Sequence, residues 1–230
     1  MARSTTFFIT GTDTDAGKTL SACAILAAAR DKGLSTAAVK PVAAGVTSGG
    51  INADVLALAA YCSPLLETAM INPVCFNEPI APHIAAARSD RVLRAGDLAR
   101  HCEAVMAMNA DITLIEGAGG WKVPVNEQET LADMAVMLGV PVILVVGMRL
   151  GCLNHALLTA QAIQADGLPL AGWIANSVDA DMAAYADNLL TLAAMLPAPL
   201  LAEIPRLGGD DDSRIAAASA LIDLEQLLQP

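Results

Sequence analysis

The chain has 230 residues, of which 55% are hydrophobic, so it is long enough to bury a sizeable core without disulfides or structural metals. Only 3% of the residues are aromatic, which disfavours a nucleic-acid binder built on stacking platforms. The formal net charge of −11 repels nucleic acids and anionic membranes, so any phosphate must be held by a local site rather than by the overall field.

The cysteines and the apolar stretches disfavour several further classes of protein. The 5 cysteines include no C-x-x-C pair, which disfavours a zinc ribbon or a redox dithiol. The N-terminus has no signal-peptide pattern, and the longest uncharged stretches contain proline and fall short of the roughly 18 residues that suggest a membrane-spanning helix. We therefore expect a single cytoplasmic domain over residues 1–230.

Short apolar segments rich in β-branched residues alternate with longer segments rich in Ala and Leu. The short segments predict buried strands at Thr6–Thr10, Ala37–Lys40, Ile112–Glu116, Val140–Gly147, Leu170–Asn176 and Leu200–Ile204. The longer segments predict helices at Lys18–Lys32, Ala53–Cys62, Ala95–Met108, Leu131–Leu138, Asn154–Asp166 and Ala180–Leu196, with a terminal helix from Ser213. This alternation predicts an α/β fold with a doubly wound, mostly parallel sheet flanked by helices. Ligands of such sheets bind beyond the carboxyl ends of the strands.

The segment after the first predicted strand has the features of a phosphate-binding loop. It runs Gly11-Thr-Asp-Thr-Asp-Ala-Gly17-Lys18-Thr19 between a strand and an apolar helix, which is the setting of a P-loop. Lys18 would reach the β- and γ-phosphates, and the Thr19 hydroxyl would ligate Mg²⁺. The loop has one residue more between its glycines than the strict motif. An ordinary turn with an exposed lysine is the alternative, which the Gly-Lys-Thr ending disfavours.

Three charged residues lie at other predicted strand ends or helix starts. Lys40 follows the second strand and could neutralise a transferring phosphoryl group, although an exposed strand-end lysine explains it better when it is taken alone. Glu116 ends an apolar strand before a glycine-rich turn, which matches a carboxylate that holds Mg²⁺. Asp54 begins a helix, where it could merely interact with the helix dipole. Together with Thr19, Asp54 and Glu116 would be sufficient protein ligands for Mg²⁺.

The ordered set of motifs resembles the dethiobiotin synthetase family over roughly residues 7–207. The motifs are GTDTDAGKT, KPVAAG (40–45), NAD (52–54), EGAGGW (116–121), VILVVG (142–147), LGCLNHALLT (150–159) and LAGWIAN (170–176). The resemblance implies a P-loop NTPase-like ligase of biotin biosynthesis that uses ATP and Mg²⁺. Such an enzyme carboxylates 7,8-diaminononanoate with CO₂ (or bicarbonate as its source) and closes the ureido ring of dethiobiotin. The reaction passes through a carbamate and a carbamic–phosphoric mixed anhydride and releases ADP and phosphate.

The resemblance also implies roles for individual residues. Lys18 and Lys40 are implied as the catalytic residues, and Thr19, Asp54 and Glu116 as the Mg²⁺ ligands. The implied nucleotide-binding residues are Asp15, Ala16, Gly17, Lys18, Thr19, Leu20, Asp54, Glu116, Gly117, Ala118, Gly119, Asn176, Ser177, Pro205, Arg206 and Leu207. The implied substrate-binding residues are Lys40, Ala44, Gly151, Cys152, Leu153 and Asn154. In the family the last four belong to the partner subunit of a homodimer, at the start of a helix.

Several residues near these motifs leave alternatives open. Ala44 stands where the family usually carries a hydroxyl residue that contacts substrate, so either Thr47 or Ser48 substitutes or the contact is missing. We expect Trp121 to act as a lid over the site and His83 to be structural. His155 could be a packing or capping residue. Truncation of Lys40 to Ala is expected to abolish ring closure and to leave the fold intact.

Two other functions compete with this interpretation. A partitioning or septum-positioning ATPase has the same type of sheet and P-loop, but usually carries an additional lysine near the start of the loop, where this chain has Thr12. Such ATPases often use basic or amphipathic patches, against which the net charge of −11 argues. A glutamine-dependent amidoligase of corrinoid synthesis needs a further glutaminase domain, for which 230 residues leave no room.

Overall fold

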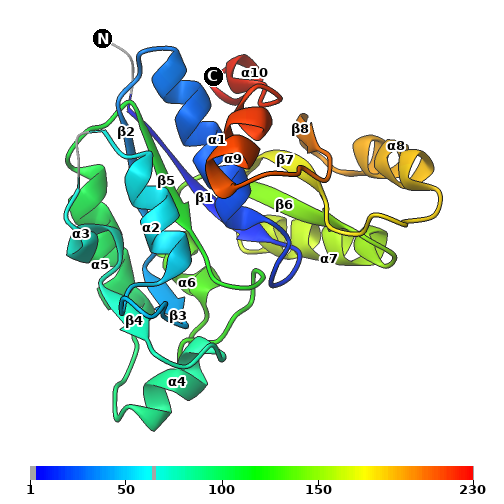
Figure 1. Ribbon diagram of the computed structural model, residues 1–230. Helices are drawn as coiled ribbons and strands as arrows, with labels where there is room; N and C mark the ends of the chain where they lie inside the picture. The colour runs from blue at the N-terminus through cyan, green and yellow to red at the C-terminus, as the bar shows by residue number, and fades with distance from the viewer. Residues whose placement is uncertain (1–3, 64–65, 230) are drawn as a thin grey trace.

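The computed structural model describes residues 4–63 and 66–229. A six-stranded sheet runs through its centre, with helices on both faces (Figure 1). The strand order is β2-β5-β1-β6-β7-β8, and every ladder between neighbours is parallel. The strands are β1 (Thr5–Gly11), β2 (Thr36–Val39), β5 (Ile112–Glu116), β6 (Val142–Met148), β7 (Leu170–Ser177) and β8 (Leu200–Ile204). The predicted α/β class and all six predicted strands are confirmed.

Burial explains why these segments form strands. Every residue of β5 and β6 is buried, because helices cover both faces of the sheet. Along β6, Ile143 and Val145 face one helical layer, whereas Leu144 and Val146 face the other. The continuous runs of Val, Ile and Leu that predicted the strands therefore reflect burial on two sides.

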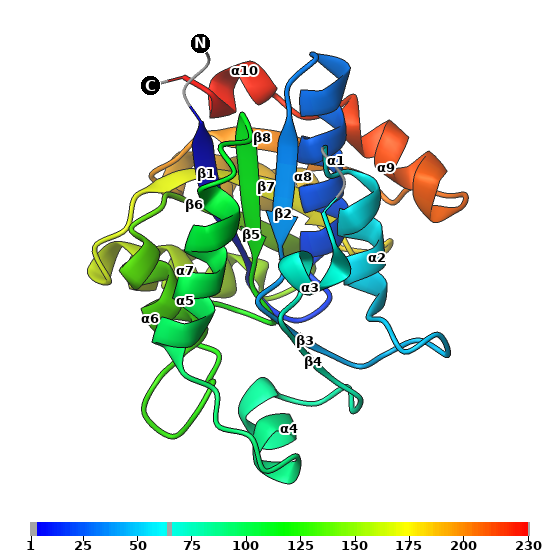
Figure 2. The same cartoon turned by 90° about the vertical axis from the view of Figure 1, so that its left-hand side faces the viewer.

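Two helical layers enclose the sheet (Figure 2). One layer consists of α1 (Lys18–Asp31), α2 (Ala53–Ala60), α9 (Asp211–Ser219) and α10 (Leu224–Leu227). The other consists of α5 (Ala95–Met106), α6 (Leu131–Leu138), α7 (Cys152–Ala165) and α8 (Tyr185–Met195). In the first layer, Ile215 of α9 and Leu227 of α10 pack into the cluster that contains α1, so the segment after Leu207 completes one face of the core.

The sequence patterns missed the shorter elements. A second, two-stranded parallel sheet pairs β3 (Val42–Ala44) with β4 (Val74–Phe76). The helices α3 (Thr68–Ile71) and α4 (Pro82–Arg88) were also not predicted. Elements of three to seven residues are too short to show a clear hydrophobic period.

Three of the helices begin at other residues than predicted, and a side-chain cap explains one of the shifts. Helix α9 begins at Asp211, because the side chain of Asp210 accepts a hydrogen bond from Ser213 N at 2.9 Å. Helix α8 begins at Tyr185 rather than Ala180, and α7 begins at Cys152 rather than Asn154. Among the described residues, no helix is both long enough and apolar enough to cross a membrane.

The topology places a ligand crevice at the carboxyl ends of β1 and β6. These neighbouring strands continue in opposite directions, since the chain leaves β1 towards β2 at one edge and leaves β6 towards β7 on the other side. Such a switch point is where open α/β sheets bind ligands. Both connections therefore carry candidate functional residues.

Candidate functional site

The loop between β1 and α1 is shaped to present backbone N–H groups. Gly17 is the N-cap of α1 with φ 97°, and no side chain caps the helix there. The first N–H groups of α1 are thus left to bind an anion. Two contacts hold the loop to neighbouring strands: Asn176 Nδ2 donates to Ala16 O at 2.9 Å, and Gly147 N donates to Thr12 Oγ1 at 3.2 Å.

Lys18 lies across this loop instead of extending into solvent. Its side chain is buried, and Nζ donates to the backbone O of Asp13 at 3.1 Å. Burial lowers the pKa of Lys18 from its ordinary value of 10.5, and the carboxylate of Glu116 opposes this shift only in part. The ammonium group of Lys18 therefore lies next to the loop, on the side where a phosphate would bind.

A second lysine and two carboxylates meet beside the P-loop. Lys40 Nζ lies 2.6 Å from Glu116 Oε1 and 2.6 Å from Asp54 Oδ2. Lys40 is only 4% exposed and Glu116 only 1% exposed, so Lys40 is not a solvent-exposed strand-end lysine. Thr19 Oγ1 donates to the same Glu116 oxygen at 2.8 Å, which joins the cluster to α1. We call Thr19, Lys40, Asp54 and Glu116 the lysine–carboxylate cluster.

Strand pairing explains how residues so distant in sequence meet. Val39 is the register partner of Ile115, so Lys40 and Glu116 leave two adjacent parallel strands side by side. Asp54 comes from the first turn of α2, whose N-cap is Asn52. The cluster therefore depends on the β2–β5 pairing and on the docking of α2.

The ionic contacts shift the pKa values of Lys40 and Asp54 in the direction that favours the charged form of each. Burial lowers the pKa of Lys40, but the carboxylates of Glu116 and Asp54 outweigh it and raise the pKa above the ordinary value of 10.5. Burial raises the pKa of Asp54, but the ammonium group of Lys40 outweighs it and lowers the pKa below the ordinary value of 3.8.

These shifts predict how stability changes with pH. The lowered pKa of Asp54 stabilises the fold above pH 3.8, and this contribution is lost as the pH falls through the folded-state value. The raised pKa of Lys40 stabilises the fold below pH 10.5 and is lost as the pH rises through its folded-state value. Urea unfolding of the wild type and Asp54→Asn should differ most between these limits. A difference that stays constant beyond both limits would contradict the assignment.

The donor set of the cluster fits Mg²⁺ bound together with a nucleotide. Among the described residues, no group of three or more His, Cys, Asp or Glu side chains could hold a metal ion on its own. Mg²⁺ is usually bound by one or two protein carboxylates together with waters and phosphates. Asp54 and Glu116 would provide the carboxylates, and the Thr19 hydroxyl would provide a further oxygen ligand. Glu116 Oε2 is also buried without a hydrogen-bond partner in the described part of the chain, which leaves an acceptor available.

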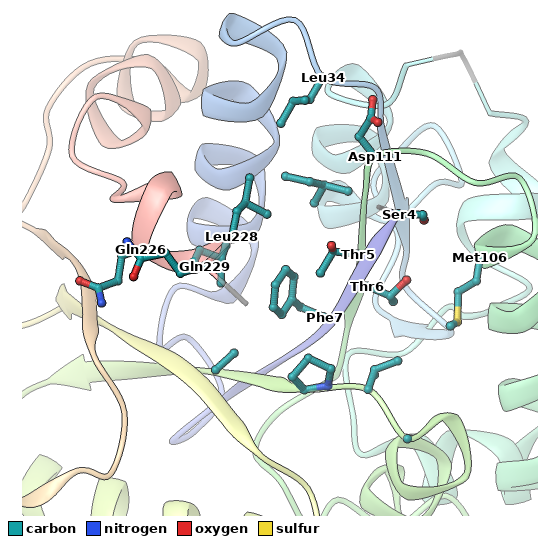
Figure 3. A pocket seen from close by; sticks show the side chains of 16 residues that line it. Ser4, Thr5, Thr6, Phe7, Leu34, Met106, Asp111, Gln226, Leu228 and Gln229 are labelled. Atoms are coloured by element: carbon teal, nitrogen blue, oxygen red, sulfur yellow. The ribbon is translucent and has the colours of Figure 1, made fainter. Parts of the chain in front are cut away.

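A cavity also lies away from this cluster. It has a volume of about 770 Å³ and is lined by residues such as Thr6, Asp111 and Leu228 (Figure 3). These residues belong to the amino-terminal end of the sheet and to the end of the chain, whereas the P-loop lies at the carboxyl end of β1. This cavity is therefore separate from the candidate site.

Comparisons with known proteins identify the family. The family model described as an AAA domain matches residues 5–211. A Cellvibrio japonicus protein named ATP-dependent dethiobiotin synthetase BioD is 55% identical over 225 residues, which cover 96% of this chain and 97% of that protein. The chain belongs to the dethiobiotin synthetase family. Relatives with the same enzyme name from Pseudomonas aeruginosa and Escherichia coli are 51% and 45% identical, and cover 96% of this chain and 97% and 98% of their own.

Solved structures share the fold at low sequence identity. A chain of the MinC:MinD cell division complex from Aquifex aeolicus matches with a TM-score of 0.57 and 13% identity, over 98% of this chain and 93% of that one. A ParA family ATPase from Chlorobium tepidum matches with a TM-score of 0.54 and 11% identity, over 96% and 91%. Likeness at this identity shows the fold alone. The partitioning-ATPase alternative is therefore not favoured over the dethiobiotin synthetase family.

The loop after β5 carries the glycines that the family resemblance assigns to the nucleotide. A Cβ atom at Gly120 would lie 3.5 Å from Gly11 O, so this loop lies against the P-loop. Trp121, however, is only 4% exposed and packs edge-to-face on Phe8, with ring centroids 5.8 Å apart. Its Nε1 donates to Asp166 Oδ2 at 2.7 Å. The prediction that Trp121 is a lid is wrong, because its indole is part of the core.

The expected adenine-binding residues lie next to one another at the ends of β7 and β8. Asn176 is the register partner of Ile204, so the segment 205–207 leaves the sheet beside it. Arg206 Nη1 donates to Val178 O at 3.2 Å, which ties that segment to the end of β7. One amide donor of Asn176 is used for Ala16 O, so this residue also positions the P-loop.

The turn after Ala44 contains Thr47 and Ser48, the two residues that could replace the missing hydroxyl. Thr47 Oγ1 donates to Ile51 O at 2.8 Å and accepts from Gly49 N at 3.3 Å, so its hydroxyl is used within its own turn. This geometry counts against Thr47 as a replacement for the hydroxyl that the family usually carries. Ser48 is exposed in the same turn.

The segment Gly151–Asn154 forms the start of α7. Gly151 is the N-cap with no side-chain cap, the Cys152 side chain is buried, and Asn154 is exposed. Leu150, just before the helix, is 91% exposed. In the part of the chain that the structure describes, no hydrogen bond or ion pair joins this segment to the lysine–carboxylate cluster of the same chain.

Two asparagines that sequence reasoning missed hold the site together. Asn52 accepts from Asp54 N at 3.0 Å and donates to Gly45 O at 2.7 Å, so it links α2 to the loop after β3. Asn72 Nδ2 donates to Lys40 O at 2.6 Å. The Asn-Ala-Asp pattern at a helix start is an N-cap signal that could have identified Asn52. The contact of Asn72 is purely tertiary and leaves no local signal.

Proposed function

We propose that this chain converts 7,8-diaminononanoate, CO₂ and ATP into dethiobiotin, ADP and phosphate, with Mg²⁺ as the cofactor. The observation that carries the proposal is the lysine–carboxylate cluster beside a P-loop, in a chain that belongs to the dethiobiotin synthetase family. A P-loop alone would indicate only nucleotide binding. The additional buried lysine supplies a cation where a phosphoryl group would be transferred.

The chemistry requires positioning and charge stabilisation rather than a side-chain nucleophile. One amine of the substrate attacks CO₂ and loses a proton, and a carbamate oxygen then attacks the γ-phosphorus while ADP leaves. The second amine attacks the activated carbonyl carbon, and phosphate leaves as the ring closes. Negative charge develops at the carbamate and at the phosphoryl oxygens, so fixed cations lower the barrier.

Each residue of the site would have a separate task in this reaction. The first N–H groups of α1 and the side chain of Lys18 would bind the β- and γ-phosphates. Lys40 would stabilise the carbamate and the transferring phosphoryl group. Thr19, Asp54 and Glu116 would hold Mg²⁺, which supplies charge neutralisation on the phosphates when it is bound. The segments around Asn176 and Pro205–Leu207 would bind the adenine.

The decisive experiment is a phosphate-release assay with MgATP and bicarbonate, with and without 7,8-diaminononanoate. We expect release that depends on the diamine, with dethiobiotin detected by mass spectrometry in equal amount. Release that ignores the diamine but responds to DNA or lipid would instead support a switch ATPase. Substitution of GTP for ATP in the same assay tests the preference for the base.

We also propose that the protein acts as a cytoplasmic homodimer. In this dimer, residues 151–154 of one subunit bind the carboxylate of the diamine that lies in the active site of the other subunit. An uncapped helix N-terminus suits a carboxylate, and the exposed Leu150 beside it would be covered by a second subunit.

Leu150→Asp is therefore expected to give a monomer that binds MgATP but loses at least about ten-fold in diamine-dependent turnover, since a buried charge opposes association. Sedimentation and a steady-state assay measure both effects. Val92→Asp is the matched control, because Val92 is 73% exposed in the segment between α4 and α5. A Leu150→Asp variant that stays dimeric would contradict the proposed interface.

A further inference from the structure

An ion pair connects the P-loop to the start of α7. Arg149 Nη2 donates to Asp13 Oδ2 at 2.5 Å. The two residues are far apart in sequence and meet because β1 and β6 are neighbours, with Gly11 the register partner of Val145. Each residue follows one strand of the pair that forms the crevice.

Asp13 is a junction within the P-loop. Its Oδ1 accepts from Thr14 N at 2.8 Å, and its backbone O accepts from Lys18 Nζ at 3.1 Å. The second carboxylate oxygen is left for Arg149. The position of Asp13 therefore depends on where the side chain of Lys18 lies.

Arg149 is equally fixed to the start of α7. Its backbone O accepts from Cys152 N at 2.9 Å, in the turn that leads into the helix. Gly151, within this turn, is the helix N-cap. The backbone of Arg149 is therefore part of the turn that orients the first N–H groups of α7, while its side chain contacts the P-loop.

Nucleotide binding would change the contacts of Asp13. A phosphate bound at the loop would offer Lys18 Nζ an acceptor that competes with Asp13 O, so this hydrogen bond of the junction would weaken. A ligand shifts a conformational equilibrium only through such differences in contacts between the two states. The ion pair is half-exposed, so its effect on an equilibrium is a few-fold rather than a switch.

We propose that Asp13 and Arg149 are positioning residues that couple nucleotide binding at the P-loop to binding of the diamine carboxylate at the start of α7. The inference rests on the proposed function, because it takes residues 151–154 as the carboxylate site. In the proposed homodimer, the pair transmits nucleotide occupancy of one subunit to the diamine site that it shares with the other. The coupling is reciprocal, so the diamine also changes nucleotide affinity by the same factor.

The test is the Kd of 7,8-diaminononanoate, measured by calorimetry with and without a non-hydrolysable MgATP analogue. In the wild type we expect the analogue to change this Kd by about five-fold or more. Arg149→Gln and Asp13→Asn should each reduce the ratio of the Kd without the analogue to the Kd with it by about two- to five-fold. Asp13→Asn keeps an acceptor for Thr14 N, and Arg149→Lys keeps the charge and should retain most of the coupling.

The matched control is Lys32→Gln, which removes the exposed Lys32–Glu225 ion pair, 2.8 Å long, at the opposite end of α1. It should leave the ratio unchanged. A wild-type ratio of one, or a ratio that neither variant alters, would overturn the coupling. If Arg149→Gln weakened diamine binding equally with and without the analogue, the coupling would also be overturned, because Arg149 would then bind the carboxylate directly. A wild type without diamine-dependent turnover would remove the proposed function itself, and the coupling with it.

Discussion

Replacing Lys40 by Met is expected to abolish dethiobiotin formation and to destabilise the fold. Removal of a preorganised group that stabilises developing charge costs about 10²–10³ in kcat. Loss of one partner of a buried ion pair also costs about 3–5 kcal/mol, because Glu116 keeps an uncompensated buried charge. Diamine-dependent turnover and urea unfolding measure the two effects. The sequence suggested that the fold would be unaffected, and the structure replaces that expectation.

A second substitution separates charge from packing in this experiment. Lys40→Met combined with Glu116→Gln removes the unpaired charge while it preserves side-chain volume. We expect the double variant to regain at least half of the lost free energy of unfolding but to remain inactive. Asp54 needs no such compensation, since its side chain is 40% exposed. A double variant no more stable than the single one would show that packing carries the loss, and full activity in Lys40→Met would remove Lys40 from the mechanism.

Gly17→Ala is expected to lower the affinity for MgATP at least about ten-fold, since a displaced loop loses hydrogen bonds to a charged phosphate that contribute about 1.5–3 kcal/mol each. Gly17 has φ 97°, where an L side chain costs roughly 1–2 kcal/mol. A Cβ atom would also lie only 2.0 Å from Asn176 Nδ2, the group that holds the loop at Ala16 O. Either the loop or Asn176 has to move. Nucleotide binding can be measured by calorimetry.

Gly33→Ala is the matched control for this substitution. Gly33 follows the other end of α1 with φ 78°, and a Cβ atom there would meet nothing within 4 Å. It should cost about 1 kcal/mol of stability from the backbone alone and leave MgATP affinity unchanged. Adding Asn176→Ala to Gly17→Ala removes the clash but not the backbone strain, and it also removes the hydrogen bond to Ala16 O and the proposed adenine contact, so nucleotide binding should recover only in part. Equal MgATP affinity in Gly17→Ala and the wild type would contradict the assigned phosphate cradle.

Local sequence determined the features that depend on a few neighbouring residues. Short apolar segments rich in β-branched residues predicted all six strands of the main sheet, because burial on two faces favours apolar side chains at most positions. The Gly-Lys-Thr segment between Ile9 and Leu20 predicted the loop before α1, because phosphate binding needs a particular backbone path. The expectation of one domain over residues 1–230 stays a prediction, as do the roles of the individual site residues.

Only the tertiary structure decided which of the candidate side chains touch. Lys40 could not be distinguished from a solvent-exposed lysine until the β2–β5 pairing placed it between Asp54 and Glu116. Trp121 could not be recognised as a core residue until its packing on Phe8 was seen. The pair of Asp13 and Arg149 has no sequence signal, because the two residues meet only through the pairing of β1 with β6, two strands that are far apart in the chain. Periodicity and turn chemistry are read from neighbouring residues, whereas charge pairing depends on distances that only strand order and helix docking define.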